Sequence, residues 1–167
     1  MKNRLLLFLI LFILIFTLFG CTFNKEQPKK ETKKIKIENE KDTYIKYIQK
    51  LKKIKETSED LPFTVEVKYE KMDDEVRYQV IIDNPTNNIT DVKALAVHNK
   101  QTDDVFPSVS IFDKKVKLIP NKKPSGVILV GYIPYEGDID NLDVEIKVLI
   151  SYKIDNKSYT SYYVTKK

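Results

Sequence analysis

From Phe63 to the C-terminus, apolar and polar residues alternate, and this pattern limits the fold more than any other feature of the chain. The alternation is clearest in residues 63–70, 76–82 and 142–150. Successive side chains of a strand point to opposite faces of a sheet, so a period of two predicts one buried face and one solvated face. The pattern therefore predicts antiparallel strands.

Breaks in this alternation divide residues 62–167 into candidate strands. The expected strands are residues 63–70, 76–82, 89–98, 105–112, 116–119, 126–133, 142–150 and 159–164. Residues 126–133 are almost wholly apolar, which predicts a central strand covered on both faces. Strands of this number and length predict an all-β immunoglobulin- or fibronectin-III-like sandwich of seven or eight antiparallel strands.

Part of this region resembles a known module. Residues 81–99 combine an Asn-containing break with a strand that carries Asp91-Val92-Lys93, and Leu118-Ile119-Pro120 forms a later turn. These features resemble the FxLYD domains of bacterial lipoproteins, although His98 stands where that pattern has an aromatic–Asp pair. The resemblance implies a structural or binding role and carries over no site residue.

The N-terminus reads as an export signal. Lys2 and Arg4 precede an apolar run from Leu5 to Phe19, which is short for a membrane span of about 20 residues. The run ends in Leu18-Phe19-Gly20-Cys21, which resembles the lipobox of bacterial lipoproteins. That resemblance implies removal of residues 1–20 by cleavage between Gly20 and Cys21, and a diacylglycerol on the Cys21 sulfur. Phe19 is bulkier than the pattern usually has, which leaves an uncleaved N-terminal anchor as the alternative.

Lipidation of Cys21 would fix the location of the mature protein. Two acyl chains anchor a protein stably, whereas one holds it only marginally. We therefore expect a lipid-anchored protein on the extracytoplasmic face of the cell membrane. Because Cys21 is the only cysteine, the exported domain is expected to contain no disulfide.

Residues 21–39, the lipidated Cys and a Lys-rich segment, are predicted to be a flexible tether. Residues 22–58 hold 12 Lys against 6 acidic residues, whereas residues 59–167 hold 15 basic against 18 acidic residues. A basic segment next to the bilayer is attracted to anionic lipid by about 1 kcal/mol per Lys. The alternative is a spacer that is merely solvated. Nucleic-acid binding, the other use of a basic run, is disfavoured by the predicted location.

Residues 40–61 are predicted to form a short amphipathic helix and a connector. Tyr44, Ile48 and Leu51 recur at helical spacing, and Pro62 ends the segment. The apolar face has three alternatives: packing on the following domain, lying on the membrane surface, or pairing with a second copy. Packing on the chain's own domain, residues 62–167, is the expectation we favour.

The residues that carry chemistry are sparse. His98 is the only histidine, which excludes a site with several His ligands, and the glycines are too scattered for a phosphate loop. Acidic residues gather at predicted turns: Asp73 to Glu75, Asp103 and Asp104, and Asp138 to Asp143. Solvated charge is their ordinary role, and the last group lacks the Gly and Glu of an EF-hand calcium loop. We predict no catalytic residue, metal or cofactor; the alternative is a cell-surface hydrolase that uses these acids or His98.

Tyrosines concentrate in the predicted last hairpin. Tyr159 and Tyr163 share one face of the strand, where they serve either sheet packing or contact with an envelope protein or a glycan. The sequence as a whole thus predicts a non-catalytic binding or envelope-assembly module held at the membrane.

Overall fold

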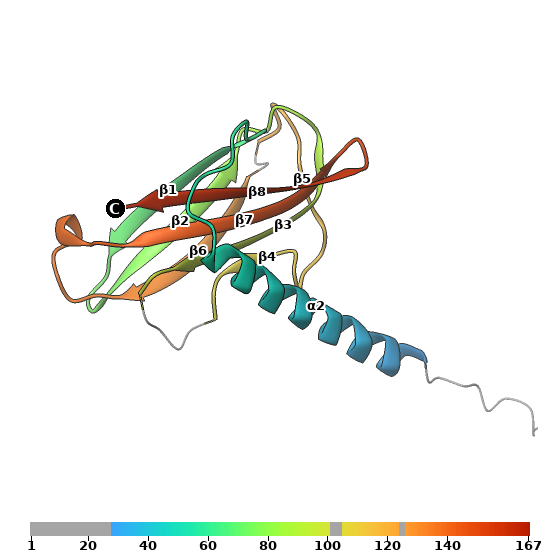
Figure 1. Ribbon diagram of the computed structural model, residues 1–167, viewed down its shortest axis with the longest axis horizontal. Coiled ribbons are helices and arrows are strands. Elements are labelled where there is room, and N and C mark those ends of the chain that lie inside the picture. Colours follow the sequence, from blue (N-terminus) through green and yellow to red (C-terminus); the bar gives the residue numbers. More distant parts are fainter. Residues whose placement is uncertain (1–27, 101–104, 124–125) are drawn as a thin grey trace, which may run out of the picture. The chain divides into compact units, whose positions relative to one another are not determined.

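The computed structural model describes residues 28–100, 105–123 and 126–167 (Figure 1). The chain divides into two units, and the second, Ile37–Lys167, contains every strand of the described residues. The predicted signal peptide and the lipidation site at Cys21 lie outside the described residues, as do Asp103 and Asp104.

One long helix, eight strands and one short 3₁₀ helix make up the described chain. In order they are α2 (Pro28–Lys52), β1 (Thr64–Lys71), β2 (Glu75–Asp83), β3 (Ile89–His98), β4 (Ser108–Val109), β5 (Val116–Leu118), β6 (Val127–Pro134), η1 (Ile139–Asn141), β7 (Glu145–Ile154) and β8 (Lys157–Lys166). The tight turn before β8 places Asp155 and Asn156 at positive φ, as a two-residue hairpin requires.

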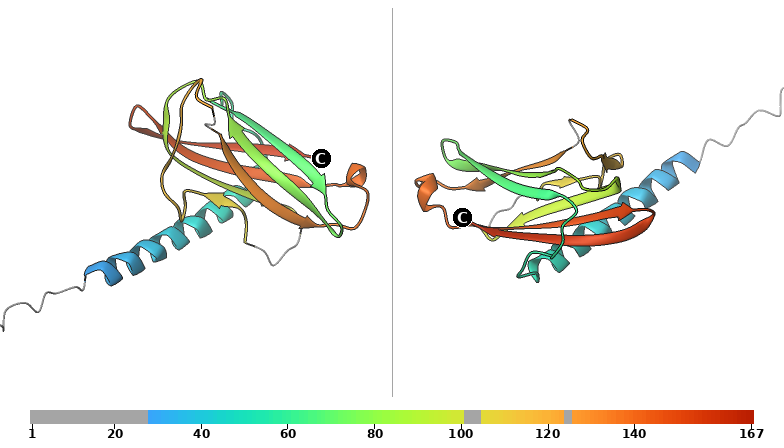
Figure 2. Two further views of the ribbon diagram at one scale, coloured as in Figure 1. Left: turned by 180° about the vertical axis from the view of Figure 1, so that it is seen from behind. Right: turned by 90° about the horizontal axis from the view of Figure 1, so that it is seen from above.

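The strands form two antiparallel sheets that pack face to face (Figure 2). One sheet has the order β1-β2-β6, and the other has the order β4-β3-β7-β8, with β5 pairing beside β3. Their facing sides bury one common core that takes residues from both sheets. This arrangement confirms the predicted all-β sandwich of seven or eight antiparallel strands.

Alternation produces the core as expected. In β2, every second residue from Val76 to Ile82 is fully buried, and the intervening ones are half-buried. Across the pair, Gly131 of β6 lies opposite Tyr78, and a side chain at Gly131 would overlap the Tyr78 ring. Gly131 therefore provides the space into which the buried Tyr78 ring packs.

The prediction of a central strand at residues 126–133 is wrong, because β6 is an edge strand. It pairs with β2 only, and its residues alternate strictly between buried and exposed. Nothing in the described chain forms a layer over its outer face. The near-continuous apolar sequence therefore reflects an exposed apolar row rather than burial on both faces.

The strand expected at residues 105–112 is mostly absent. Only Ser108–Val109 pairs with β3, and Ser110 then adopts a positive φ of 58°. A non-glycine residue in the left-handed region leaves the extended conformation, so the strand stops there. The Ser110 hydroxyl donates to the Lys114 carbonyl oxygen at 3.0 Å, which stabilises this turn.

The helix begins at Pro28, well before residue 40, so residues 28–39 are helical and not the flexible coil that we predicted. Proline is well suited to the first helical position, because its fixed φ matches a helix and it lacks the N–H that would have no partner there. The following Lys and Glu residues have high helix propensity, which the low apolar content of this segment obscured.

The C-terminal half of α2 packs on the sandwich, which settles the choice among the three alternatives. Leu51 is fully buried in a second cluster with Leu95, Val97 and Leu149 of the five-stranded sheet. The Tyr44 hydroxyl also donates to the Phe106 carbonyl oxygen at 3.2 Å. The expectation that this helix packs on its own domain is confirmed.

Candidate functional site

The outer side of β6 carries a row of exposed apolar side chains, which we call the β6 face. It consists of Ile128, Val130 and Tyr132, which are 56%, 41% and 44% exposed. Alternation places all three on the side of the sheet that points away from the core. No charged residue lies between Val127 and Ile133.

A groove runs beside the β6 face. It has a volume of about 560 Å³ and lies between β6 and the segment before β4. Its lining consists of Glu75, Tyr78, His98, Val105, Phe106, Pro107, Val130, Gly131 and Tyr132. Within it, the His98 ring contacts the Tyr78 ring and the Phe106 ring edge to face, with centroid distances of 5.8 Å and 5.7 Å. We call this site the β6 groove.

The backbone of β6 faces the groove with one unpaired edge. In the part of the chain that the structure describes, β2 pairs with one side of β6, and no strand pairs with the other side. An unpaired strand edge presents a row of N–H and C=O groups to any extended segment of suitable shape. An extended segment laid along this edge would place alternate side chains on the β6 face and in the groove.

The opposite edge of the same sheet is protected by charge. The outward residues of β1 are Thr64, Glu66, Lys68 and Glu70, and all four are exposed. Lys68 pairs with Glu66 at 3.6 Å, and Arg77 pairs with Glu70. Charged side chains along an edge oppose strand addition, because a new strand would have to desolvate them.

The edge at β8 is protected in a different way, by the connector between α2 and β1. The Ser58 N–H donates to the Tyr162 carbonyl oxygen at 2.9 Å, and the Tyr162 N–H donates to the Ser58 hydroxyl oxygen at 2.9 Å. The Val164 N–H likewise donates to the Thr57 hydroxyl oxygen at 3.0 Å. These bonds occupy outer backbone groups of β8 at Tyr162 and Val164. Among the long edge strands of the described residues, β6 alone is neither charged nor capped.

The two tyrosines predicted to contact a partner have different environments. Tyr163 packs against the sandwich core. Burial, and to a smaller extent the neighbouring Tyr163, raises the pKa of Tyr69 to about 12. Tyr159 is 43% exposed, and its ring stacks on Tyr152 with the centroids 5.7 Å apart. The structure therefore gives Tyr163 a packing role and leaves only Tyr159 as an exposed ring of the hairpin.

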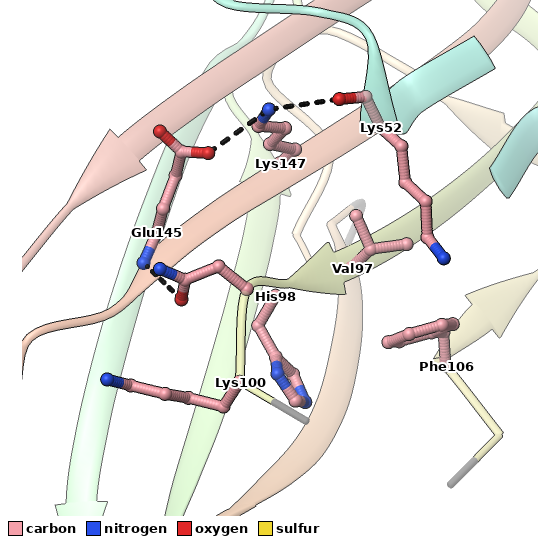
Figure 3. Close-up of a pocket in the computed structure, with 8 residues that line it drawn as sticks. Lys52, Val97, His98, Lys100, Phe106, Glu145 and Lys147 are labelled. Carbon is pink, nitrogen blue, oxygen red and sulfur yellow. Dashed lines mark hydrogen bonds and ion pairs between the residues drawn. The ribbon is translucent and has the colours of Figure 1, made fainter. Parts of the chain in front are cut away.

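His98 also lines a second pocket, of about 390 Å³ (Figure 3). The side chains of Lys52 and Lys100 diverge from His98, so they do not converge on one point (Figure 3). The Lys147 Nζ atom is engaged by the Glu145 carboxylate at 3.1 Å and by the Lys52 carbonyl oxygen at 3.3 Å. None of the described residues that line this pocket is a Ser, Thr or Cys that could act as a nucleophile with His98.

Two carboxylates of the described chain have a pKa that departs from its ordinary value, and in both cases the pKa is lowered. A hydrogen bond from Lys147 is the main cause that lowers the pKa of Glu145. Hydrogen bonds from Lys153, at 2.8 Å, and from Lys115 lower the pKa of Asp91. A general acid needs a raised pKa, so these two ion-paired carboxylates fit structural roles better than acid catalysis.

The acidic turns that remained as hydrolase candidates have backbone and capping roles. Asp138 caps η1, because its carboxylate accepts the Asp140 N–H at 3.0 Å. The Asp74 carbonyl oxygen accepts the Tyr135 N–H at 3.0 Å, which joins the β1–β2 turn to the end of β6. No group of three or more His, Cys, Asp or Glu side chains in the described ranges is placed to hold a metal ion.

No helix within the described residues is both long enough and apolar enough to cross a membrane. Residues 1–27 are not among them.

No family model matches the chain, and no curated protein matches it. The resemblances to a lipobox and to FxLYD domains therefore stay predictions, and function has to be argued from the β6 edge.

Sequence reasoning missed the β6 face, although the signal was present. Residues 126–133 are apolar on both faces of the strand, which we interpreted as burial on both sides. The same pattern also fits an edge strand whose outer face awaits a partner. Only the strand order separates the two interpretations, and the sequence does not supply it.

Proposed function

We propose that this protein is a lipid-anchored extracytoplasmic module without catalytic activity, which binds an extended segment of a partner in the β6 groove. The observation that carries the proposal is the contrast among the long edge strands of the described chain. Charge protects β1 and the connector caps β8, whereas β6 is apolar, unpaired and bordered by an aromatic groove. Soluble proteins avoid such edges because they promote association, so an open apolar edge indicates a use for it.

In recognition by strand addition, the backbone supplies affinity and the side chains supply specificity. Backbone hydrogen bonds to the outer edge of β6 would supply affinity. Alternate side chains of the added strand would then reach the rings of His98 and Phe106 on one side and the β6 face on the other. Tyr132 is well suited to such contact, because tyrosine offers a large area at a low cost in conformational entropy.

Anchoring through Cys21 would hold this edge near the bilayer. The N-terminal basic segment supports the same location, because lysines close to the surface attract anionic lipid. The hydrolase alternative has less support, since none of the described residues that line the His98 pocket is a nucleophile and Glu145 is ion-paired.

Photocrosslinking on intact cells tests the binding site with a matched pair of positions. Tyr132 and Tyr159 are almost equally exposed, at 44% and 43%, but they lie on β6 and β8. A photoreactive residue at position 132 is expected to give one discrete adduct, because a partner strand would lie across the β6 face. The same residue at position 159 is expected to give none.

A third arm tests whether the adduct depends on the β6 edge. Adding Val130→Lys to the position-132 protein should abolish the adduct, because a lysine would be buried against the partner strand. Equal adducts from positions 132 and 159, or an adduct that survives Val130→Lys, would exclude the β6 groove as the binding site.

A further inference from the structure

We propose that the strand received at β6 is β6 of a second copy of this chain, so that two sandwiches join edge to edge in antiparallel orientation. This inference rests on the proposed function, since it names the partner of that same edge. Joining β6 to its copy would merge two three-stranded sheets into one sheet of six strands, with the order β1-β2-β6-β6-β2-β1.

The β6 face is self-complementary about Val130. A twofold axis through Val130 sets the two Val130 side chains opposite each other, and it sets Ile128 of each copy opposite Tyr132 of the other. Aromatic and β-branched side chains form favourable cross-strand pairs in antiparallel sheets. One register therefore covers the whole exposed row of both copies with apolar partners.

The inner side of β6 fits the same register. The axis through Val130 places Leu129 of one copy opposite Gly131 of the other. Gly131 has no side chain, and its own copy fills the space above it with the Tyr78 ring. Leu129 of each copy therefore lies opposite a residue without a side chain, next to the Tyr78 ring of the other copy.

Charge at the two ends of β6 selects the antiparallel orientation. Exposed Lys122 and Lys123 precede the strand, and exposed Glu136 and Asp138 follow it. Antiparallel pairing brings the basic end of one strand beside the acidic end of the other, whereas parallel pairing would bring like charges together. Like charges side by side disfavour association, so these flanks oppose the parallel alternative.

A single cysteine on the proposed axis gives a sharp test in the full-length protein on native membranes. In an antiparallel pair, residues directly opposite each other have Cα atoms about 4.5–5.5 Å apart, which lies within disulfide range. Val130→Cys should therefore form a covalent, reductant-sensitive homodimer on mild oxidation. The yield should exceed, by several fold, that of the unsubstituted protein, whose only cysteine is Cys21.

Two further variants fix the register. Ile128→Cys should not crosslink to itself, because the axis through Val130 separates the two copies of position 128 by four residues, or about 13 Å. The double variant Ile128→Cys with Tyr132→Cys should crosslink, because position 128 of each copy then lies opposite position 132 of the other copy. Lys68→Cys on β1 is the matched control for random collision, since it lies at the other edge of the same sheet.

A Val130→Cys dimer no more abundant than that of Lys68→Cys or of the unsubstituted protein overturns self-pairing. Failure of this inference is distinguishable from failure of the proposed function. A position-132 photoadduct whose mass corresponds to a different protein, with no Val130→Cys dimer, rejects the second copy as partner but keeps β6 as the binding site. Absence of both results rejects both proposals.

Discussion

Replacing Leu51 by alanine is expected to lower the free energy of unfolding by about 2–5 kcal/mol, because it removes a fully buried side chain and leaves a cavity between helix and sheet. Leu51 belongs to a cluster that includes Leu95 and Leu149, so the loss falls on the outer face of the five-stranded sheet. The measurement is denaturant unfolding of the full-length protein in mild detergent, followed by the circular dichroism of the strands.

Ile45→Ala is the matched control for this experiment. Ile45 lies on the same helix but is 41% exposed, so its truncation should change the free energy of unfolding by no more than about 0.5 kcal/mol. Equal effects of the two variants would show that α2 does not belong to the core. In that case the membrane surface and a second copy would again be the alternatives for its apolar face.

Cys21→Ser is expected to abolish stable membrane anchoring, because the thiol is the only acceptor for the proposed lipid. The variant should either be released into the medium or remain with its signal segment uncut. Membrane fractionation and the intact mass of the N-terminus distinguish these outcomes. The neighbouring substitution Thr22→Ser serves as the control. It should leave the membrane fractionation unchanged and alter the intact mass only by the difference between Thr and Ser.

A contrary result is equally clear for the anchor. If Cys21→Ser protein stays in the membrane and is still cut after Gly20, the lipoprotein interpretation fails. The β6 groove would then have to act without a lipid tether, and the location of the protein would be open.

The period-two alternation was enough to predict the sandwich, because every second side chain of a strand lies on the same face and one face is buried. The β3 boundaries, Ile89 and His98, follow directly from it. The Asp155-Asn156 turn was also readable, since those residue types tolerate the positive φ that a tight hairpin needs.

Strand order and local backbone conformation could not be read in the same way. Whether residues 127–134 lie in the middle or at the edge of a sheet depends on partners far away in sequence. The early end of β4 depends on the left-handed conformation of Ser110, which its residue type does not announce. The start of α2 at Pro28 was missed because a Lys-rich segment was judged by its lack of apolar residues rather than by its helix propensity.

The candidate site was predicted least well for the same reason. Tyr163 was taken with Tyr159 as one contact surface because both share a strand face, but that face points toward Tyr69 and the core at Tyr163. Tyr132, on a strand that seemed buried, is as exposed as Tyr159. The position of a residue in the alternation gives its face of the strand, but only the complete sheet shows whether that face is covered.

Amide hydrogen exchange of β6 tests the central claim, that a strand adds to this edge, most directly. The full-length protein on native membranes is compared with the same protein carrying Val130→Lys, and residues 64–71 of β1 serve as the internal reference. The account predicts slower exchange in residues 127–134 of the unsubstituted protein than in the variant, because an added strand would bond the outer N–H groups of β6, and equal exchange of β1 in both. Equal exchange of β6 in the two proteins would contradict it.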